Sequence, residues 1–479
     1  MWRILSAKMT HKLSKVKIKY KKSKFLILKF GNIKKILYLC SRFRKQCDKN
    51  HEKRNDMLEE LTAKNFLSFR DEVSLSFEAT NDTMGEEQMV TTMPDGKRLL
   101  RLAMIYGANA SGKTNVLLAL NGLKKFWGLV PRDVDAKTGW QPFRFDPETP
   151  KQPTEISLRF YANGKRYWYT LCLNANQVLE EKLSYYSSNR PTMLFHRVME
   201  EGRLTLDVNP AVNKLSDVEL QQLRINCFDN MSFFAARGKV NIVLSYIDDA
   251  REWMRKQVMD TIDPDLHMFD YAKARVEADP ALLSYLLDKL KSSDFNISDM
   301  QTERKASDMP TELVRLVNEN QGFSDDMKRN LLTELQAKFE HTVHTSRGEE
   351  KYMLEDEWES RGTRRMIGME SVIYRANQKG ALLPIDEIES SLHPALIEHV
   401  LYDFLQTGGE SQLLVTTHYD YLLDLVNDLI RKDCVWFTEK GKDGATSLYS
   451  LDEFAGLNKL RSIQRAYRGG RFGATPNIG

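Results

Sequence analysis

Cysteine is scarce in this chain, with five among 479 residues, at positions 40, 47, 172, 227 and 434. None of them belongs to a C-x-x-C pair, and together they do not form a recognisable pattern of metal ligands. The sequence therefore predicts neither a zinc site nor a disulfide framework. A reducing compartment suits such a sequence, and we expect a cytoplasmic protein.

Long apolar runs are also missing. No segment approaches the roughly 20 consecutive apolar residues that a membrane helix needs, so we expect no membrane partner. Residues 1–56 combine 18 Lys and Arg with three acidic residues, and lysines interrupt each apolar run there. No apolar core or cleavage site of a secretory signal can be drawn in that segment.

Charge is distributed unevenly along the chain. Residues 57–479 hold 52 basic and 63 acidic residues, so an acidic body follows a basic leader at residues 1–56. The leader has three interpretations: an arm that binds nucleic acid, a solvated disordered tail, or translated sequence ahead of a true start at Met57. We favour the last, because the regular apolar pattern begins directly after Met57.

Residues 107–115 contain the motif around which the chain is organised, Gly-x-x-x-x-Gly-Lys-Thr. The apolar residues 99–106 predict a buried strand before it, and the apolar residues from Val116 predict a helix after it. In this context the loop and helix amides surround phosphate oxygens, Lys113 bridges the β and γ phosphates, and the Thr114 hydroxyl binds Mg²⁺. The predicted nucleotide-binding residues are Gly107, Asn109, Ala110, Ser111, Gly112, Lys113, Thr114 and Asn115.

The sequence around this loop predicts two kinds of structure. Alternating residues at 58–69 and 73–77 predict an antiparallel hairpin, and period-2 segments at 154–161, 165–173 and 177–186 predict an antiparallel sheet. Helical spacing at 235–261, 280–291 and 325–339 predicts a helical insertion over residues 205–345 that contacts a partner, a second copy or DNA. The ATPase would then comprise residues 57–204 and 346–479.

Candidate chemistry resumes in the last third of the chain. Ser360 and Gly362 form a Ser-x-Gly turn at the start of a predicted helix. The hydroxyl and the amides of such a turn can bind the opposite side of a phosphate group. The apolar residues 380–385 predict a strand that ends in Asp386 and Glu387. At that position Asp386 would hold Mg²⁺ through water, and Glu387 would act as general base on the attacking water.

Two further elements complete the series. Residues 390–394 predict a turn into a helix, and residues 412–417 predict a buried strand that delivers His418 to its carboxyl end. Ligands bind at that edge of an open α/β sheet. His418 would hydrogen-bond a γ-phosphate there.

In this order the motifs resemble those of ABC-type ATPases of the RecF, SMC and OLD (overcoming lysogenization defect) kind. Residues 65–69 resemble the N-terminal strand motif of that group. More narrowly, residues 359–363, 385–394 and 467–476 resemble single-domain bacterial ATP-binding proteins related to OLD, including RloA-like ATPases of abortive-infection and anti-phage modules. The resemblance covers residues 57–479 and implies an α/β fold with a central mixed sheet, an antiparallel β subdomain and a helical insertion.

The resemblance also implies an assembly. Two copies would lie head to tail around two ATP molecules, with Ser360 and Gly362 of one copy closing on the γ-phosphate held by the other. Ser391 would lie in the D-loop and His418 in the switch position. Gln141 and Gln152 are both candidates for the Q-loop glutamine.

These observations favour an ATP-hydrolysing sensor or switch of a bacterial anti-phage module. No Toprim-like acidic cluster follows residue 420, so the effector it controls, such as a nuclease, would be a separate protein. The alternative is a RecF-like repair or recombination ATPase that binds DNA directly, which the acidic body disfavours. A GTPase is disfavoured too, because the chain has no Asn-Lys-x-Asp guanine motif.

Overall fold

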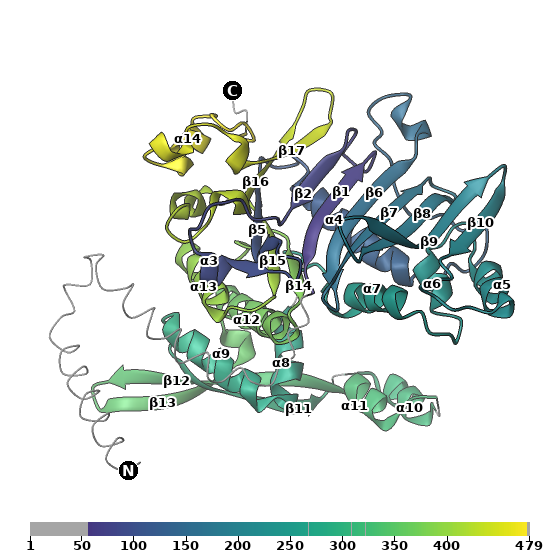
Figure 1. Ribbon diagram of the computed structural model, residues 1–479. Coiled ribbons are helices and arrows are strands. Elements are labelled where there is room, and N and C mark those ends of the chain that lie inside the picture. The colour runs from purple at the N-terminus through teal and green to yellow at the C-terminus, as the bar shows by residue number, and fades with distance from the viewer. Residues whose placement is uncertain (1–55, 267, 308, 321, 477–479) are drawn as a thin grey trace, which may run out of the picture. The chain divides into compact units, whose positions relative to one another are not determined.

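The computed structural model describes residues 56–476 except 267, 308 and 321 (Figure 1). Residues 1–55 of the predicted leader therefore lie outside the described residues. Contacts within the chain join the described residues into one compact unit. In the described ranges, no helix is both long and apolar enough to cross a membrane.

A five-stranded mixed sheet forms the centre of this unit, in the order β14-β15-β5-β16-β17. β14, β15, β5 and β16 run parallel, and β17 is antiparallel to β16. The residues of the parallel strands are mostly apolar and are all buried except Glu439 and Lys440 at the end of β16, as expected where both faces of a sheet are covered. Their bounds are β5 Leu102–Tyr106, β14 Leu382–Ile385, β15 Gln412–Thr417, β16 Val435–Lys440 and β17 Thr446–Ser450.

Helices connect and flank these strands. α4 (Lys113–Gly128) follows β5, α12 (Arg361–Lys379) precedes β14, and α13 (Pro394–Thr407) joins β14 to β15. The predicted strand at 99–106 is divided by Arg101 into β4 (Arg98–Leu100) and β5. The buried Arg101 guanidinium donates to the carbonyls of Leu405 and Ser411.

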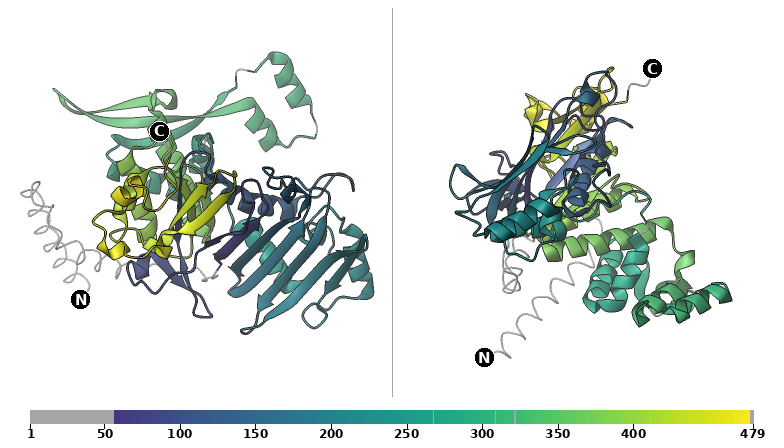
Figure 2. Two further views of the ribbon diagram at one scale, coloured as in Figure 1. Left: turned by 90° about the horizontal axis from the view of Figure 1, so that it is seen from above. Right: turned by 90° about the vertical axis from the view of Figure 1, so that its right-hand side faces the viewer.

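The second sheet has seven antiparallel strands in the order β10-β9-β8-β7-β6-β1-β2, seen side by side in Figure 2. Their bounds are β1 Leu58–Lys64, β2 Val73–Ser76, β6 Thr154–Ala162, β7 Lys165–Leu173, β8 Val178–Tyr186, β9 Pro191–Glu200 and β10 Arg203–Val208. The predicted hairpin and antiparallel sheet are both confirmed. The predicted fold class, α/β with a central mixed sheet and an antiparallel subdomain, is confirmed as well.

The region predicted as a helical insertion contains helices, but it is not wholly helical. A three-stranded antiparallel sheet crosses it, formed by β11 (Ile297–Ala306), β12 (Thr333–Thr345) and β13 (Gly348–Glu355). Its helices are α5 Asp217–Asn226, α6 Phe233–Arg237, α7 Ser245–Lys256, α8 Met268–Ala278, α9 Pro280–Ser292, α10 Thr311–Glu319 and α11 Asp325–Leu332.

The predicted helix at 325–339 is wrong beyond Leu332. Ala337 and Phe339 are both fully buried and lie two residues apart, which is the spacing of a strand. Pairing with β11 and β13 decides the conformation of β12, and a sequence window cannot show such long-range pairing.

Short elements complete the described chain. α3 Glu86–Met89 precedes the two-stranded pair of β3 Val90–Thr92 and β4, and α14 Ile463–Arg468 lies near the C-terminus. The 3-10 turns are η1 Thr149–Lys151, η2 Asp356–Trp358, η3 Asp420–Leu425, η4 Lys432–Cys434, η5 Leu451–Glu453 and η6 Leu457–Lys459.

A buried glutamine joins the two main sheets. Gln412, at the start of β15, accepts a hydrogen bond from Leu58 N–H at 2.7 Å through Oε1. Its Nε2 lies 2.9 Å from the Leu58 carbonyl oxygen and 3.1 Å from that of Leu100. One side chain thus pairs three backbone groups where β1 meets the central sheet.

Replacing Gln412 with leucine would leave these three buried backbone groups without partners. At about 1–3 kcal/mol for each such group, we expect Gln412→Leu to lower the free energy of unfolding by roughly 3 kcal/mol or more. Urea denaturation measures the change, with Gln221→Leu on the exposed face of α5 as the control. A loss below about 1 kcal/mol would contradict this role.

Candidate nucleotide-binding site

The parallel strands of the central sheet bring the predicted site residues to one edge. In the register of these strands, Tyr106 pairs with Thr417, and Ile385 pairs with Val415. The phosphate loop follows Tyr106, Asp386 follows Ile385, and His418 follows Thr417. Because parallel strands end at the same edge, the three motifs meet there.

The phosphate loop has the backbone that its motif predicts. Gly112 caps α4 with φ of 108°, and Ala110 has φ of 61°. Gly107 leaves no room for a side chain, because a Cβ there would lie 2.5 Å from both Ser111 Oγ and Thr438 Oγ1. Helix geometry leaves the first two amides of α4, those of Lys113 and Thr114, available to an anion. The amide of Asn115 donates to the Gly112 carbonyl at 3.0 Å.

Lys113 is the buried cation of the loop. Its Nζ donates to the carbonyl oxygens of Gly107 at 2.9 Å and Ala108 at 3.1 Å. Burial lowers the pKa of Lys113, and the carboxylates of Glu387, Glu389 and Asp386 oppose this shift. The ammonium group therefore lies within the field of the acidic residues that follow β14.

Thr114 and Asp386 form the predicted metal position. Thr114 Oγ1 lies 3.0 and 3.2 Å from the two carboxylate oxygens of Asp386. A hydroxyl and a carboxylate are oxygen donors of the kind that Mg²⁺ prefers. Together with Lys113 and the loop amides, this donor set fits a Mg²⁺-bound nucleoside triphosphate.

Thr416 on β15 arranges the acidic residues, and no sequence pattern predicted this role. Its hydroxyl donates to Asp386 Oδ1 at 2.5 Å and accepts from Glu387 N–H at 2.9 Å. Its carbonyl accepts from Ile388 N–H at 3.1 Å. Thr416 is fully buried, so one side chain fixes the predicted magnesium ligand and the backbone of the predicted base.

Three more hydroxyl residues hold the phosphate loop from outside. Ser111 Oγ lies 2.7 Å from Thr438 Oγ1 on β16, and Asn115 Nδ2 donates to Ser68 Oγ at 2.6 Å. Thr446 on β17 donates to the Ser111 carbonyl at 2.8 Å. Ser68 belongs to the 65–69 motif noted in the sequence, whereas no sequence pattern marks Thr438 or Thr446.

The predicted Ser-x-Gly turn and the predicted D-loop lie side by side. Ser360 caps α12, and its Oγ accepts from Thr363 N–H at 2.9 Å. A Cβ on Gly362 would lie 3.3 Å from the carbonyl oxygen of Ser391. Ser360 and Ser391 are exposed, so these two predicted residues belong to one accessible surface.

His418 lies at the carboxyl end of β15, as predicted, and has a partner that the sequence did not predict. Glu389 Oε1 accepts from the His418 backbone N–H at 2.8 Å and lies 3.0 Å from its ring Nδ1. The His418 side chain is half exposed, with 48% of its surface accessible. The ring thus reaches solvent at the edge where the phosphate loop opens.

Both candidate Q-loop residues contact the 65–68 segment. The Gln141 carbonyl accepts from Leu67 N–H at 2.9 Å, and the Gln152 carbonyl accepts from Asn65 Nδ2 at 2.8 Å. Both glutamines are exposed. The two candidates therefore stay open.

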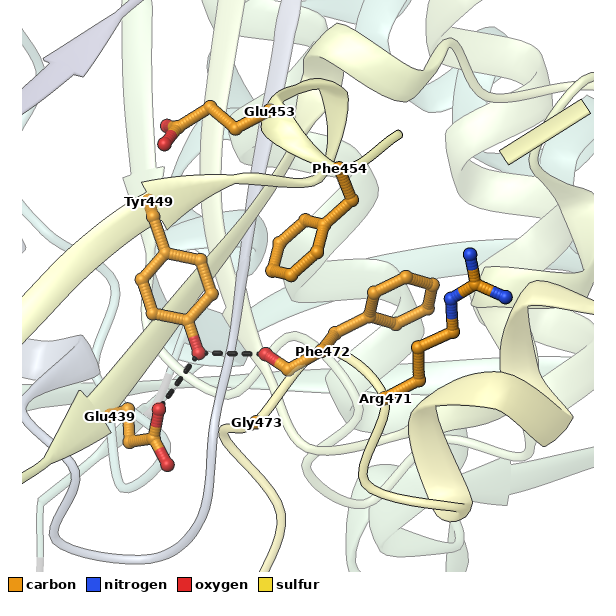
Figure 3. A pocket seen from close by; sticks show the side chains of 7 residues that line it. All are labelled: Glu439, Tyr449, Glu453, Phe454, Arg471, Phe472 and Gly473. Atoms are coloured by element: carbon orange, nitrogen blue, oxygen red, sulfur yellow. Dashed lines mark hydrogen bonds between the residues drawn. The ribbon is translucent and has the colours of Figure 1, made fainter. Parts of the chain in front are cut away.

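The C-terminal motif packs beside the central sheet, where its residues line a pocket with those of β16, β17 and η5 (Figure 3). Phe472 stacks on Phe437 with 5.7 Å between ring centroids, and the Tyr449 hydroxyl donates to the Phe472 carbonyl at 2.7 Å. None of the predicted nucleotide-binding residues lines this pocket. Tyr467 contacts Tyr106, the residue that precedes the phosphate loop.

Fold and site together define a P-loop ATPase. Residues 102–205 and 250–424 match the family described as "AAA domain, putative AbiEii toxin, Type IV TA system". These residues make up more than half of the chain, and the chain belongs to this family. No curated protein matches the sequence.

Solved structures of ATPase heads are similar to the chain at low identity. The SMC head domain from Thermotoga maritima is 12% identical with a TM-score of 0.38, over 82% of this chain and 98% of that one. The SMC head with an extended coiled coil from Pyrococcus furiosus is 12% identical with a TM-score of 0.36, over 87% and 99%. The ATP complex of the recombination mediator RecF is 12% identical with a TM-score of 0.33, over 84% and 100%. The fold is defined by the strand order β14-β15-β5-β16-β17 of the central sheet and by the motifs at its edge.

Thr416 offers a direct test of the acidic cluster. Thr416→Val keeps the shape but leaves Asp386 Oδ1 and Glu387 N–H without their shared partner, at a cost of roughly 1–3 kcal/mol. We expect the kcat of ATP hydrolysis to fall about 10- to 100-fold. Thr416→Ser keeps the hydroxyl and should retain most activity, so equal turnover in both variants would contradict this role.

Proposed function

We propose that the protein is an ATP-driven dimeric switch. Two copies close around two Mg²⁺-bound ATP molecules, each held by the phosphate loop of one copy and by the Ser360–Gly362 turn of the other. The observation that carries this proposal is the shared surface of Gly362 and Ser391, because it presents the start of α12 beside an exposed turn.

The charges of this surface suit a phosphate ligand. Arg361 and Arg364 lie in the first turn of α12, and among the described residues neither forms an ion pair with a carboxylate. The next residue, Arg365, is buried and donates to the carbonyl of Pro264 at 3.3 Å. Cations at a helix N-terminus are unfavourable unless an anion joins them. The phosphate-loop face carries more negative than positive charge, because the carboxylates of Asp386, Glu387 and Glu389 all act on Lys113.

An exposed tryptophan adds apolar surface beside this turn. Trp358, two residues before Ser360, exposes 78% of its surface. Large aromatic side chains at this exposure are typical of protein interfaces, where they bury most of their area on binding. A second copy that docks on the Ser360 turn would cover it.

Within the closed site each residue has a distinct task. Lys113 and the loop amides bind the β and γ phosphates. Thr114 and Asp386 would hold Mg²⁺, which when bound would offset charge on the transferred phosphoryl group. Glu387 accepts a proton from the attacking water. His418 donates or accepts a hydrogen bond at the γ-phosphate, and Ser391 lies at the contact between copies.

The biological role we propose is a sensor or switch in bacterial anti-phage defence that controls a separate effector such as a nuclease. The description of the matched family names a toxin of a type IV toxin–antitoxin system, which supports this setting.

Glu387→Gln tests the assignment of the base. The amide keeps the shape but cannot take a proton, so turnover should fall at least about 100-fold while ATP still binds. ATP-bound dimers should then accumulate, as measured by light scattering after gel filtration. The exposed Glu200→Gln serves as the control, and wild-type turnover in Glu387→Gln would refute the assignment.

Mixing two inactive variants tests the shared site. Lys113→Ala disables the loop, and Gly362→Asp places a negative charge at the start of α12, where it favours the helix but repels phosphate. In a mixed dimer one of the two sites is intact, so random mixing should restore about a quarter of the wild-type turnover. If the mixture stays inactive, the head-to-tail arrangement is wrong and only the P-loop ATPase class remains.

A further inference from the structure

Glu389 lies between the Asp386–Glu387 pair and the exposed turn at Ser391, and no role has been given to it so far. A single oxygen, Oε1, lies 2.8 Å from the backbone nitrogen of His418 and 3.0 Å from its ring Nδ1. Two bonds from one residue to one acceptor fix the orientation of the ring relative to its own backbone. Glu389 follows β14 and His418 follows β15, so this contact also joins the ends of two strands.

The contact determines which ring nitrogen carries a hydrogen. A carboxylate oxygen only accepts, so Nδ1 must be the donor in this pair. In the neutral ring Nε2 then has no hydrogen, so it can only accept a hydrogen bond, from a donor such as water. The half-exposed position of His418 leaves that part of the ring accessible.

The burial of Glu389 indicates that its contact with His418 has a role beyond stabilising the fold. The Glu389 side chain is only 13% exposed, and its second oxygen, Oε2, is buried without a hydrogen-bond partner among the described residues. An unpaired buried carboxylate oxygen costs free energy. By comparison, the Glu180 partner of His196 on the seven-stranded sheet is 50% exposed.

The charge of Glu389 also acts on the phosphate loop. It opposes the fall in the pKa of Lys113 that burial causes. After burial itself, it is the next cause that raises the pKa of Tyr106, the residue directly before Gly107. The charge of Glu389 thus acts on Tyr106 at the end of β5 and on Lys113 of the phosphate loop, as well as on His418.

We propose that Glu389 is the positioning residue for His418, holding the ring in the Nδ1–H form so that the Nε2 lone pair faces the γ-phosphate position, where it accepts a hydrogen bond from the attacking water. The inference deepens the proposed function and rests on it, because it assigns a task to His418 during ATP hydrolysis. Glu389 itself does not touch the nucleotide. It acts through the ring.

The first test needs no nucleotide. In the full chain labelled with ¹⁵N-histidine, the His418 ring signals are identified by their loss in His418→Ala. The wild-type ring should show the Nδ1–H tautomer, and Glu389→Ala should abolish that preference. Glu389→Gln keeps an acceptor oxygen and should retain it. An unchanged tautomer in Glu389→Ala would overturn the inference.

The second test is a double-mutant cycle on ATP hydrolysis. Glu389→Ala should lower kcat about tenfold with KM for ATP within about twofold, because the ring acts after binding. If Glu389 acts through His418, Glu389→Ala combined with His418→Ala should be no slower than His418→Ala alone. Fully additive losses, or wild-type turnover in Glu389→Ala, would overturn the inference.

Two controls keep the outcomes separate. Glu180→Ala removes the carboxylate partner of His196, 2.8 Å away, and should change neither kcat nor the His418 signals. If Glu389→Ala does not fold, Glu389→Asp withdraws the carboxylate by one methylene and should produce the same loss of tautomer preference. Absence of wild-type ATP hydrolysis would refute the proposed function, whereas the tautomer would still decide the pairing of Glu389 with His418.

Discussion

Parallel pairing of β5, β14 and β15 is the constraint on which the rest of the structure depends. The hydrogen-bond ladder fixes Tyr106 beside Thr417 and Ile385 beside Val415, so the residues that follow each strand meet at one edge. A shift of one residue would turn alternate side chains to the other face. The buried apolar strands thereby fix the position of a polar site that they do not themselves contain.

Hydroxyl and carboxylate side chains turn that edge into an ordered site. Thr416 binds three consecutive residues after β14, and Glu389 binds the residue after β15. Ser68 and Thr446 reach the phosphate loop from β1–β2 and from β17, so the antiparallel sheet also contributes to its shape. Gln412 joins the same two sheets at the opposite end of β15. The loop is therefore supported on several sides.

The two faces that we propose to meet in the dimer are complementary in charge. One carries three carboxylates around the buried Lys113, and the other carries Arg361 and Arg364 at the start of α12. Nucleotide binding would supply the charge that lets two copies approach, which is a physical basis for a switch.

The sequence by itself determined the phosphate loop, the strand–Asp–Glu motif, the antiparallel sheet and the position of His418 at a strand end. These features are local, because each depends on residue types at a fixed spacing within one strand, turn or helix start. The head-to-tail dimer was predicted only from the resemblance to ABC-type ATPases, because a residue pattern in one chain does not show how two copies meet.

Only the tertiary structure decided the rest. Thr416, Thr438, Thr446 and Glu389 act through contacts with residues distant in the sequence, and isolated hydroxyl or carboxylate residues leave no pattern. The strand at Thr333–Thr345 follows the same rule, since its partners at β11 and β13 overrode a helical spacing. The phosphate-binding groups could be predicted from local sequence motifs. The residues that orient them could not, because they act through hydrogen bonds between segments distant in the sequence.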